Sequence, residues 1–283
     1  MGFDRLAQRR EQLFEMNNRR PTPGWPLFLL GGADLEMSAI RDLLSRHVPS
    51  DRILDKSLRW GARISDYTPE ITNARLAGEH IVCIELADDL GFTTIARDIT
   101  WIDHHDARAG ANVPTSLEQL FQFLNCPANE WTRELQLIAA NDRGHITAMQ
   151  AIGASPSEIQ RIRAADRAAQ GITAEEDAAG RQATCRAEQQ CGGHLTVVHL
   201  PHSRSATVTD SLHRSLGGSG YQNLLILCSN ETDFFGSGVA VKALDAEFPG
   251  GWHGGELPCN GFWGYSAHLR LGDVLNVLIP VLH

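Results

Sequence analysis

The sequence lacks three features that would place it in particular classes of protein. No uninterrupted apolar run approaches the roughly 20 residues that a membrane helix needs. The six cysteines form no Cys-x-x-Cys pair, which argues against a disulfide framework and a thiolate zinc site. No sustained Lys/Arg stripe occurs, and the net charge is −9, whereas long nucleic acid is usually held by a basic face. We therefore expect no membrane partner, and a small or short anionic substrate.

Length and composition are those of an ordinary soluble protein. The 283 residues, 42% hydrophobic and 21% charged, suffice for one large domain or two of usual size. Residues 1–6 contain no signal-peptide apolar segment, so a cytoplasmic location is the simplest expectation. There is no internal repeat and no low-complexity segment, and the oligomeric state stays open.

Short apolar runs alternate with helical patterns in the first part of the chain. We predict strands at 26–30, 81–84 and 99–102, and a helix that starts near Asp34. A charged amphipathic helix is predicted at 3–20. Strands separated by helices at this spacing predict an α/β fold with a parallel sheet.

The pattern changes in the second part of the chain. Residues 116–191 are predicted to be helical almost throughout, beginning with a capping box at 116–119. The segment 156–190 is rich in Ala, Arg, Gln and Glu, which predicts an exposed helical connector. Strand patterns return at 195–200 and 223–228. We therefore predict an α/β domain at 1–155, a helical connector at 156–191 and a smaller α/β domain at 192–283.

A cluster of metal-binding and proton-transfer residues follows the predicted strand 99–102. Its sequence is Asp103-His104-His105-Asp106. Such residues cost burial energy at a strand exit unless they are paired or coordinated. In an open α/β sheet the carboxyl ends of the strands are where ligands bind, so this cluster is predicted to be functional.

Acidic residues also follow the other predicted strands. Asp34 and Glu36 come after the first, Glu85 comes after the second, and Asp142 lies further along, at the predicted end of a helix. Carboxylates with imidazole suit Mn²⁺ or Mg²⁺, and two such ions can clamp a phosphate. Plainer roles stay open: Asp34 as a helix cap, and Asp142 in a surface ion pair with Arg143.

With these motifs the sequence resembles the DHH phosphoesterases, a family of oligoribonuclease/pAp phosphatases, single-strand exonucleases, cyclic-dinucleotide phosphodiesterases and family II pyrophosphatases. Residues 101–105 match the defining motif, and 33–39, 82–85 and 140–144 resemble three others. The sequence departs from the family pattern at four positions. These are Leu30, where the family often has His, Glu36 and Glu85, where Asp is usual, and Met37, where Gly is usual.

The C-terminal part resembles the family's DHHA1-type substrate domain. The resemblance rests on the glycine-rich segment 248–255, which follows an apparent helix at 239–244. Glycines let backbone N–H groups approach a phosphate closely, although a plain glycine-rich turn is the alternative. The resemblance implies a substrate-binding set of Gly250, Gly251, His253 and Gly254, to which we add Arg204, either a phosphate partner or a solvated loop residue.

The resemblance also implies roles for the first domain. The implied metal ligands are Asp34, Glu36, Glu85, His104 and Asp142. Glu85 would bridge two ions, and Asp103 would orient His104. His105 would stabilise charge at the phosphate or protonate the leaving oxygen.

The expected function is a Mn²⁺-dependent phosphoesterase that acts on a small nucleotide or short oligonucleotide. One or two ions, with Mg²⁺ as an alternative, fit the ligand set. Two other functions stay open: an exonuclease on single-stranded DNA, and a degenerate DHH protein that binds a nucleotide without cleaving it. A zinc hydrolase of another fold would need a third His near His104, and none is evident.

This mechanism predicts that His104→Ala and His105→Ala each abolish turnover without unfolding the protein. The loss follows because one variant removes a metal ligand and the other the group facing the phosphate. Hydrolysis with Mn²⁺ and circular dichroism of both variants measure the two effects. Activity retained in both would contradict the mechanism.

Overall fold

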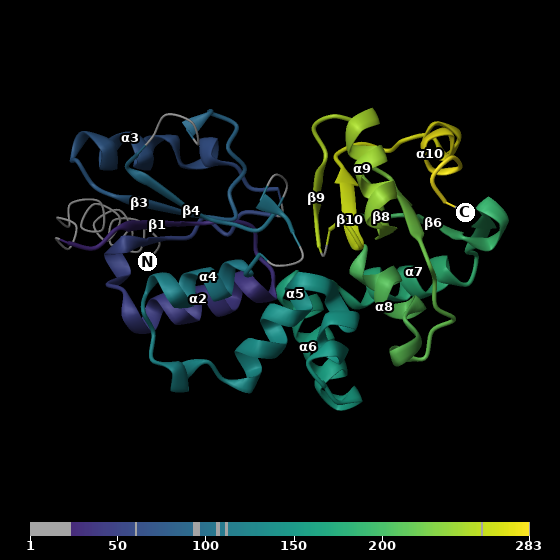
Figure 1. Ribbon diagram of the computed structural model, residues 1–283, viewed down its shortest axis with the longest axis horizontal. Helices are drawn as coiled ribbons and strands as arrows, with labels where there is room; N and C mark the ends of the chain where they lie inside the picture. Colours follow the sequence, from purple (N-terminus) through teal and green to yellow (C-terminus); the bar gives the residue numbers. More distant parts are fainter. Residues whose placement is uncertain are drawn as a thin grey trace, which may run out of the picture.

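The computed structural model describes residues 24–59, 61–92, 97–105, 108–110, 113–255 and 257–282. The expected helix at 3–20 and Asp106 lie outside these ranges. Figure 1 shows two α/β units, each built around one sheet, with helices α5 (Arg133–Ala151) and α6 (Pro156–Ala169) between them. Within the described ranges, no helix combines the length and apolar composition required to cross a membrane.

The first sheet has four parallel strands in the order β2-β1-β3-β4. They are β1 (Leu27–Leu30), β2 (Ile53–Leu54), β3 (Ile81–Ile84) and β4 (Ile99–Ile102). The predicted α/β class and parallel sheet are confirmed, and the two-residue strand β2 was not predicted. Because the predicted strands are parallel neighbours, their carboxyl ends lie at the same edge.

Helices cover both faces of this sheet, which explains why its strands are continuous apolar runs. Phe28 and Val82 pack with α2 (Leu35–His47) and α4 (Ser116–Phe123). Leu29 and Cys83 face the other way and pack with α3 (Thr68–Leu76). The alternation follows from the two-residue period of a strand.

The second sheet is mixed and has the order β5-β6-β7-β8-β10-β9. Its strands are β5 (Glu188–Gln190), β6 (Leu195–Leu200), β7 (Leu224–Cys228), β8 (Thr232–Ser237), β9 (Trp252–Gly254) and β10 (Asn260–Tyr265). Helices α7 (Ala174–Thr184) and α8 (Ala206–Leu212) pack on one face. Helices α9 (Gly238–Glu247) and α10 (Leu271–Leu278) pack on the other.

Short 3₁₀ turns complete the described secondary structure. They are η1 (Ser50–Arg52), η2 (Ile64–Tyr67), η5 (Ala128–Glu130), η6 (Cys191–Gly193) and η7 (Arg214–Leu216). The capping box before α4 is shifted by one residue from the prediction, because Thr115 is the N-cap and Glu118 occupies N3.

The predicted exposed connector differs from the structure in two ways. Helix α6 buries Ile159, Ile162 and Arg163, so it is part of the packing between the two units. The last residues of the segment form β5, which pairs with β6 in the second sheet. The low content of large apolar residues concealed this packing because α6 buries charged groups as well.

Arg163 is the centre of that buried polar packing, with 1% of its surface exposed. Its guanidinium donates to Asn141 Oδ1 of α5 at 2.9 Å, to Asp166 Oδ2 at 2.7 Å and to Asp210 Oδ1 of α8 at 2.8 Å. Arg167 also pairs with Asp210. Three helices are thereby joined by charge-assisted hydrogen bonds, which are about twice as strong as neutral ones.

Replacing Arg163 with Met is expected to lower the free energy of unfolding by about 3–5 kcal/mol, because the buried carboxylates lose their counter-charge. Arg161→Met on the same helix is the matched control: its pair with Glu134 is half exposed and should contribute at most about 1 kcal/mol. Urea unfolding followed by circular dichroism measures both. Equal losses would show that the Arg163 network does not stabilise the packing.

Candidate metal centre and adjoining cavity

Four predicted ligands meet at the carboxyl edge of the first sheet. They are Glu36 at the start of α2, Glu85 after β3, His104 after β4 and Asp142 in α5, and their donor atoms all lie within 4.8 Å of one another. His104 Nε2 lies 3.6 Å from Glu36 Oε2, 3.6 Å from Glu85 Oε1 and 2.6 Å from Asp142 Oδ2.

The converging atoms are buried and have no hydrogen-bond partner outside their own group. Glu36 Oε2, Glu85 Oε1, His104 Nε2 and Asp142 Oδ2 are shielded from solvent and face only one another. Buried polar atoms are normally satisfied, and three carboxylates with one imidazole are donors that Mn²⁺ or Mg²⁺ accepts. The residues present therefore fit a divalent cation.

The electrostatics of the cluster point the same way. Burial and the charge of Asp142 raise the pKa of Glu36 above its usual range, and burial also raises the pKa of Glu85. Burial alone lowers the pKa of His104, but the carboxylates, Asp142 first, outweigh it and raise that pKa. The three carboxylates therefore favour positive charge at the centre of the cluster, either on His104 or on a bound cation.

Asp34 occupies a different position from the other four predicted ligands. It caps α2, because its Oδ1 accepts a hydrogen bond of 2.7 Å from the backbone N–H of Met37. Burial and the nearby charges of Glu85 and Asp142 raise the pKa of Asp34 well above its usual value. The helix-cap role left open by the sequence is thus observed, next to the cluster of four.

The backbone at the ends of β1 and β3 is specialised to bring Glu85 into the cluster. Glu85 has φ +50°, an uncommon conformation for a residue other than glycine. A Cβ on Gly31 would lie 2.3 Å from the carbonyl oxygen of Glu85. Only glycine at position 31 permits this close approach.

The first turn of α4 holds the elements that carry the ligands. The backbone N–H of Leu117 donates to Glu36 Oε1 at 2.9 Å. Gln119 Nε2 donates to the carbonyl of Asp103 at 3.0 Å, next to His104. Glu118 pairs with Arg143, which follows Asp142 in the chain. Sequence reasoning identified this turn only as a capping box and missed its role.

Asp103 orients His105 rather than His104, which corrects the role implied by the resemblance. Asp103 Oδ1 lies 3.0 Å from Nδ1 of His105 and also accepts from its backbone N–H, while Oδ2 accepts from Arg108 at 3.0 Å. Burial alone lowers the pKa of His105, but the hydrogen bond to Asp103 and the charges of Glu85 and Asp103 together outweigh it and raise the pKa to about 9. Burial opposes ionisation of Asp103, yet the partner His105 lowers its pKa.

The second sheet contacts this site through Gly254 and Phe262. A Cβ on Gly254 would lie 3.3 Å from Cδ2 of His105, and the Phe262 ring centroid lies 6.2 Å from that of His105. His253 points to the opposite face of β9, where its Nδ1 lies 3.4 Å from Asp245 of α9. The structure therefore brings Gly254, but not His253, to the predicted centre.

The other predicted substrate residues lie elsewhere. Gly250 is in the exposed turn before β9, and Gly251 packs closely against Trp263 and Gly264 of β10. Arg204 Nε lies 3.5 Å from Glu176 Oε1 of α7. These three positions are explained by local structure, which favours the plainer alternatives left open by the sequence.

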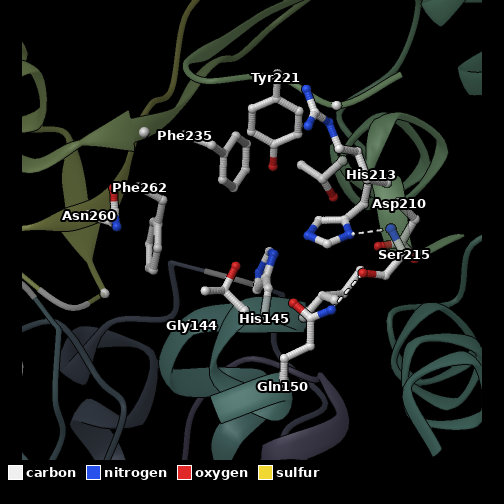
Figure 2. A pocket seen from close by; sticks show the side chains of 18 of the residues that line it. Gly144, His145, Gln150, Asp210, His213, Ser215, Tyr221, Phe235, Asn260 and Phe262 are labelled. Atoms are coloured by element: carbon white, nitrogen blue, oxygen red, sulfur yellow. Dashed lines mark hydrogen bonds between the residues drawn. The ribbon is translucent and has the colours of Figure 1, made fainter. Parts of the chain in front are cut away.

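A cavity of about 430 Å³ extends from Asp142 into the space between α5 and the second sheet. Its part lined by His145, His213, Tyr221, Phe235 and Phe262 is called the ring chamber below (Figure 2). Sequence reasoning missed all five residues. The one available signal was Gly144 in the middle of a helical pattern, a position that commonly has a functional or packing reason.

The backbone of α5 is distorted between the metal centre and the ring chamber. Gly144 has φ −166° and ψ 32°, and His145 has φ 52° and ψ −140°. A residue other than glycine in such a conformation costs about 1–3 kcal/mol and persists where the surrounding structure imposes it. The distortion turns the His145 ring into the cavity (Figure 2).

The fold is that of DHH-domain proteins. No protein-family model and no curated protein matches the sequence. Among solved structures, a DHH-domain protein described as a member of the s1p family of ribosomal proteins has a TM-score of 0.50 and 13% identity, covering 99% of this chain and 98% of that one. The expected DHH-type fold is thereby confirmed.

Two further solved structures have lower scores. An exopolyphosphatase-related protein from Bacteroides fragilis has a TM-score of 0.47 and 12% identity, with 96% of this chain and 94% of that one covered. A pGpG-specific phosphodiesterase from Vibrio cholerae has a TM-score of 0.39 and 12% identity, with 90% and 97% covered.

A saturating divalent cation is expected to stabilise the protein through the cluster of four. At 100 times its dissociation constant, Mn²⁺ should raise the free energy of unfolding by about 2.7 kcal/mol. Glu85→Gln should lose this gain without lowering stability in EDTA, because it removes a buried charge. Thermal unfolding with EDTA and with Mn²⁺ measures both, and Asp177→Asn, on the exposed face of α7, is the control. A gain that persists in Glu85→Gln would rule out this site.

Proposed function

We propose that the protein is a DHH-family, metal-dependent phosphoesterase that hydrolyses a phosphoester bond of a small nucleotide or short oligonucleotide. The observation that carries the proposal is the convergence of four buried, unpartnered donor atoms at the strand edge. The fold and the donor set of three carboxylates and one imidazole support the same chemistry. Mn²⁺ is the preferred ion and Mg²⁺ the alternative.

Glu36, Glu85, His104 and Asp142 would hold the cation, with Asp34 beside them. A second group of three, Glu85, His104 and His105, also has donors within 4.8 Å of one another, and it overlaps the first because it shares Glu85 and His104. One or two ions stay within the proposal, with Glu85 as the residue that would bridge them. A bound divalent ion supplies charge stabilisation at the phosphoryl oxygens and a water of lowered pKa.

His105 is the proposed proton carrier for the leaving oxygen. Because Asp103 accepts from Nδ1, Nε2 is the ring nitrogen that can exchange a proton with substrate. A histidine that a carboxylate holds in place is a common proton donor or acceptor in acid–base catalysis. Gly254 leaves room at His105 because any larger side chain would meet Phe262 and the imidazole.

The limited volume of the cavity favours a small substrate over a long strand. The cavity between α5 and the second sheet has a volume of about 430 Å³, near the lower end of the range for small-molecule sites. The net charge of −9 also disfavours binding of long nucleic acid. Among the functions that the sequence left open, hydrolysis of small nucleotides is therefore preferred to exonuclease action.

A panel of hydrolysis assays with Mn²⁺ tests the proposal. It comprises adenosine 3′,5′-bisphosphate, linear and cyclic dinucleotides, single-stranded DNA and pyrophosphate. We expect turnover of at least one of the small nucleotides and its loss in His104→Ala. His80→Ala, an exposed histidine bonded to Thr100, should keep wild-type activity. Nucleotide binding without hydrolysis of any compound would favour the non-cleaving alternative.

A further inference from the structure

The ring chamber is continuous with the metal centre. Asp142 belongs to the metal centre and lines the cavity that contains the chamber, and Phe262 contacts His105 on one side while lining the chamber on the other. A substrate whose phosphate lies at His104 and His105 therefore extends its next group into the cavity. The whole cavity, of about 430 Å³, has room for one nucleoside-sized group.

One wall of the chamber is aromatic. Phe235 of β8 and Phe262 of β10 are direct cross-strand neighbours, so their rings lie side by side on the face of the sheet that points toward α5. Phe235 also contacts His145, with ring centroids 6.1 Å apart. Aromatic side chains of this kind stack on flat heteroaromatic rings.

Polar groups without partners point into the same space. Among the residues that the structure describes, neither ring nitrogen of His145 has a hydrogen-bond partner, and the same holds for the hydroxyl of Tyr221 (Figure 2). Nδ1 of His213 accepts from the backbone N–H of Ser215 at 3.2 Å. Neutral His213 therefore carries its proton on Nε2, which is left as a donor.

The chamber is lined largely by neutral groups. Burial and the charge of Arg163 lower the pKa of His145 to about 4, burial lowers the pKa of His213, and burial raises that of Tyr221 to about 12. The charge of Asp210 is matched by Arg163 and Arg167. Outside the five chamber residues, the cavity is also lined by Arg143, which pairs with Glu118, and by the exposed Arg214. Such a lining suits an uncharged ring with a polar edge better than a chain of phosphates.

Resting on the proposed function, we propose that the ring chamber binds the nucleobase of the substrate. Phe235 and Phe262 stack on the face of the base, and His145, His213 and Tyr221 form hydrogen bonds with its edge. The protein therefore selects phosphoesters that carry a purine or pyrimidine next to the scissile phosphate, and it discriminates against pyrophosphate and base-free phosphoesters.

A matched pair of substrates tests the proposal: the p-nitrophenyl ester of adenosine 5′-phosphate, and the same ester with hydrogen in place of adenine. Wild type should favour the adenine ester in kcat/KM by about 10-fold or more, the size expected for one stacked base. His145→Ala and Tyr221→Phe should each lower this preference several-fold. Tyr265→Phe, on the opposite face of β10, and His80→Ala should leave it at the wild-type value.

Equal kcat/KM for the two esters in wild type would overturn the base site while leaving the phosphoesterase intact. The base site would also be overturned if Tyr221→Phe and His145→Ala both kept the wild-type ratio of kcat/KM for the two esters. Tyr221→Phe removes a single oxygen, so it guards against a misfolded variant.

Calorimetric titration in the presence of Mn²⁺ measures nucleotide affinity without turnover. It therefore tests the base site even if the proposed hydrolysis is not observed. Adenosine 5′-phosphate should bind about 10-fold more tightly than its base-free analogue, and His145→Ala should remove most of this difference. Equal affinities would overturn the proposal. Where turnover occurs, adenosine 5′-phosphate should inhibit competitively; activation or noncompetitive inhibition would place the nucleotide at a separate effector site and would also overturn it.

Discussion

The burial of unpaired ligand atoms at the carboxyl edge of the first sheet is the constraint on which the rest of the structure depends. One atom from each of three carboxylates and one imidazole is buried there with no hydrogen-bond partner outside the group, an arrangement that positive charge stabilises. Gly31, the left-handed backbone of Glu85 and the first turn of α4 all serve to keep these groups together. The backbone at Glu85 and Gly31 thus departs from regular geometry to form a site that a cation would complete.

The second unit contacts this centre, and in our proposal it selects the substrate. It approaches His105 through Gly254 and Phe262 and encloses a chamber of neutral rings. The buried Arg163 fixes the wall of that chamber, because it joins Asn141, the neighbour of Asp142, to Asp210 of α8. Asp210 also lines the cavity, and Arg163 and Arg167 balance its charge. The same ion pairs therefore join the helices and neutralise one wall of the cavity.

The sequence predicts the first sheet and its ligand edge well, because buried parallel strands are apolar on both faces and their exits are marked by acids and histidines. It does not predict the chamber. Whether Arg163 is exposed or buried depends on Asp210, 47 residues further along, and the turn at His145 depends on packing around α5. The orientation of His253 was predictable in principle, since the alternation of a strand places it opposite Gly254. That Asp103 pairs with His105, two residues further along, depends on the local backbone conformation, which the sequence pattern does not reveal.

The distorted stretch of α5 carries residues of two sites, the metal centre and the ring chamber, within four residues of each other. Asp142 stands before Gly144 and faces the cation site, and His145 stands after it and faces the chamber. A ligand that moves His145 must act on the same segment of backbone that places Asp142. Any such effect is reciprocal by thermodynamic necessity, so the affinity of the protein for its ion and for the organic part of its substrate would be linked quantities.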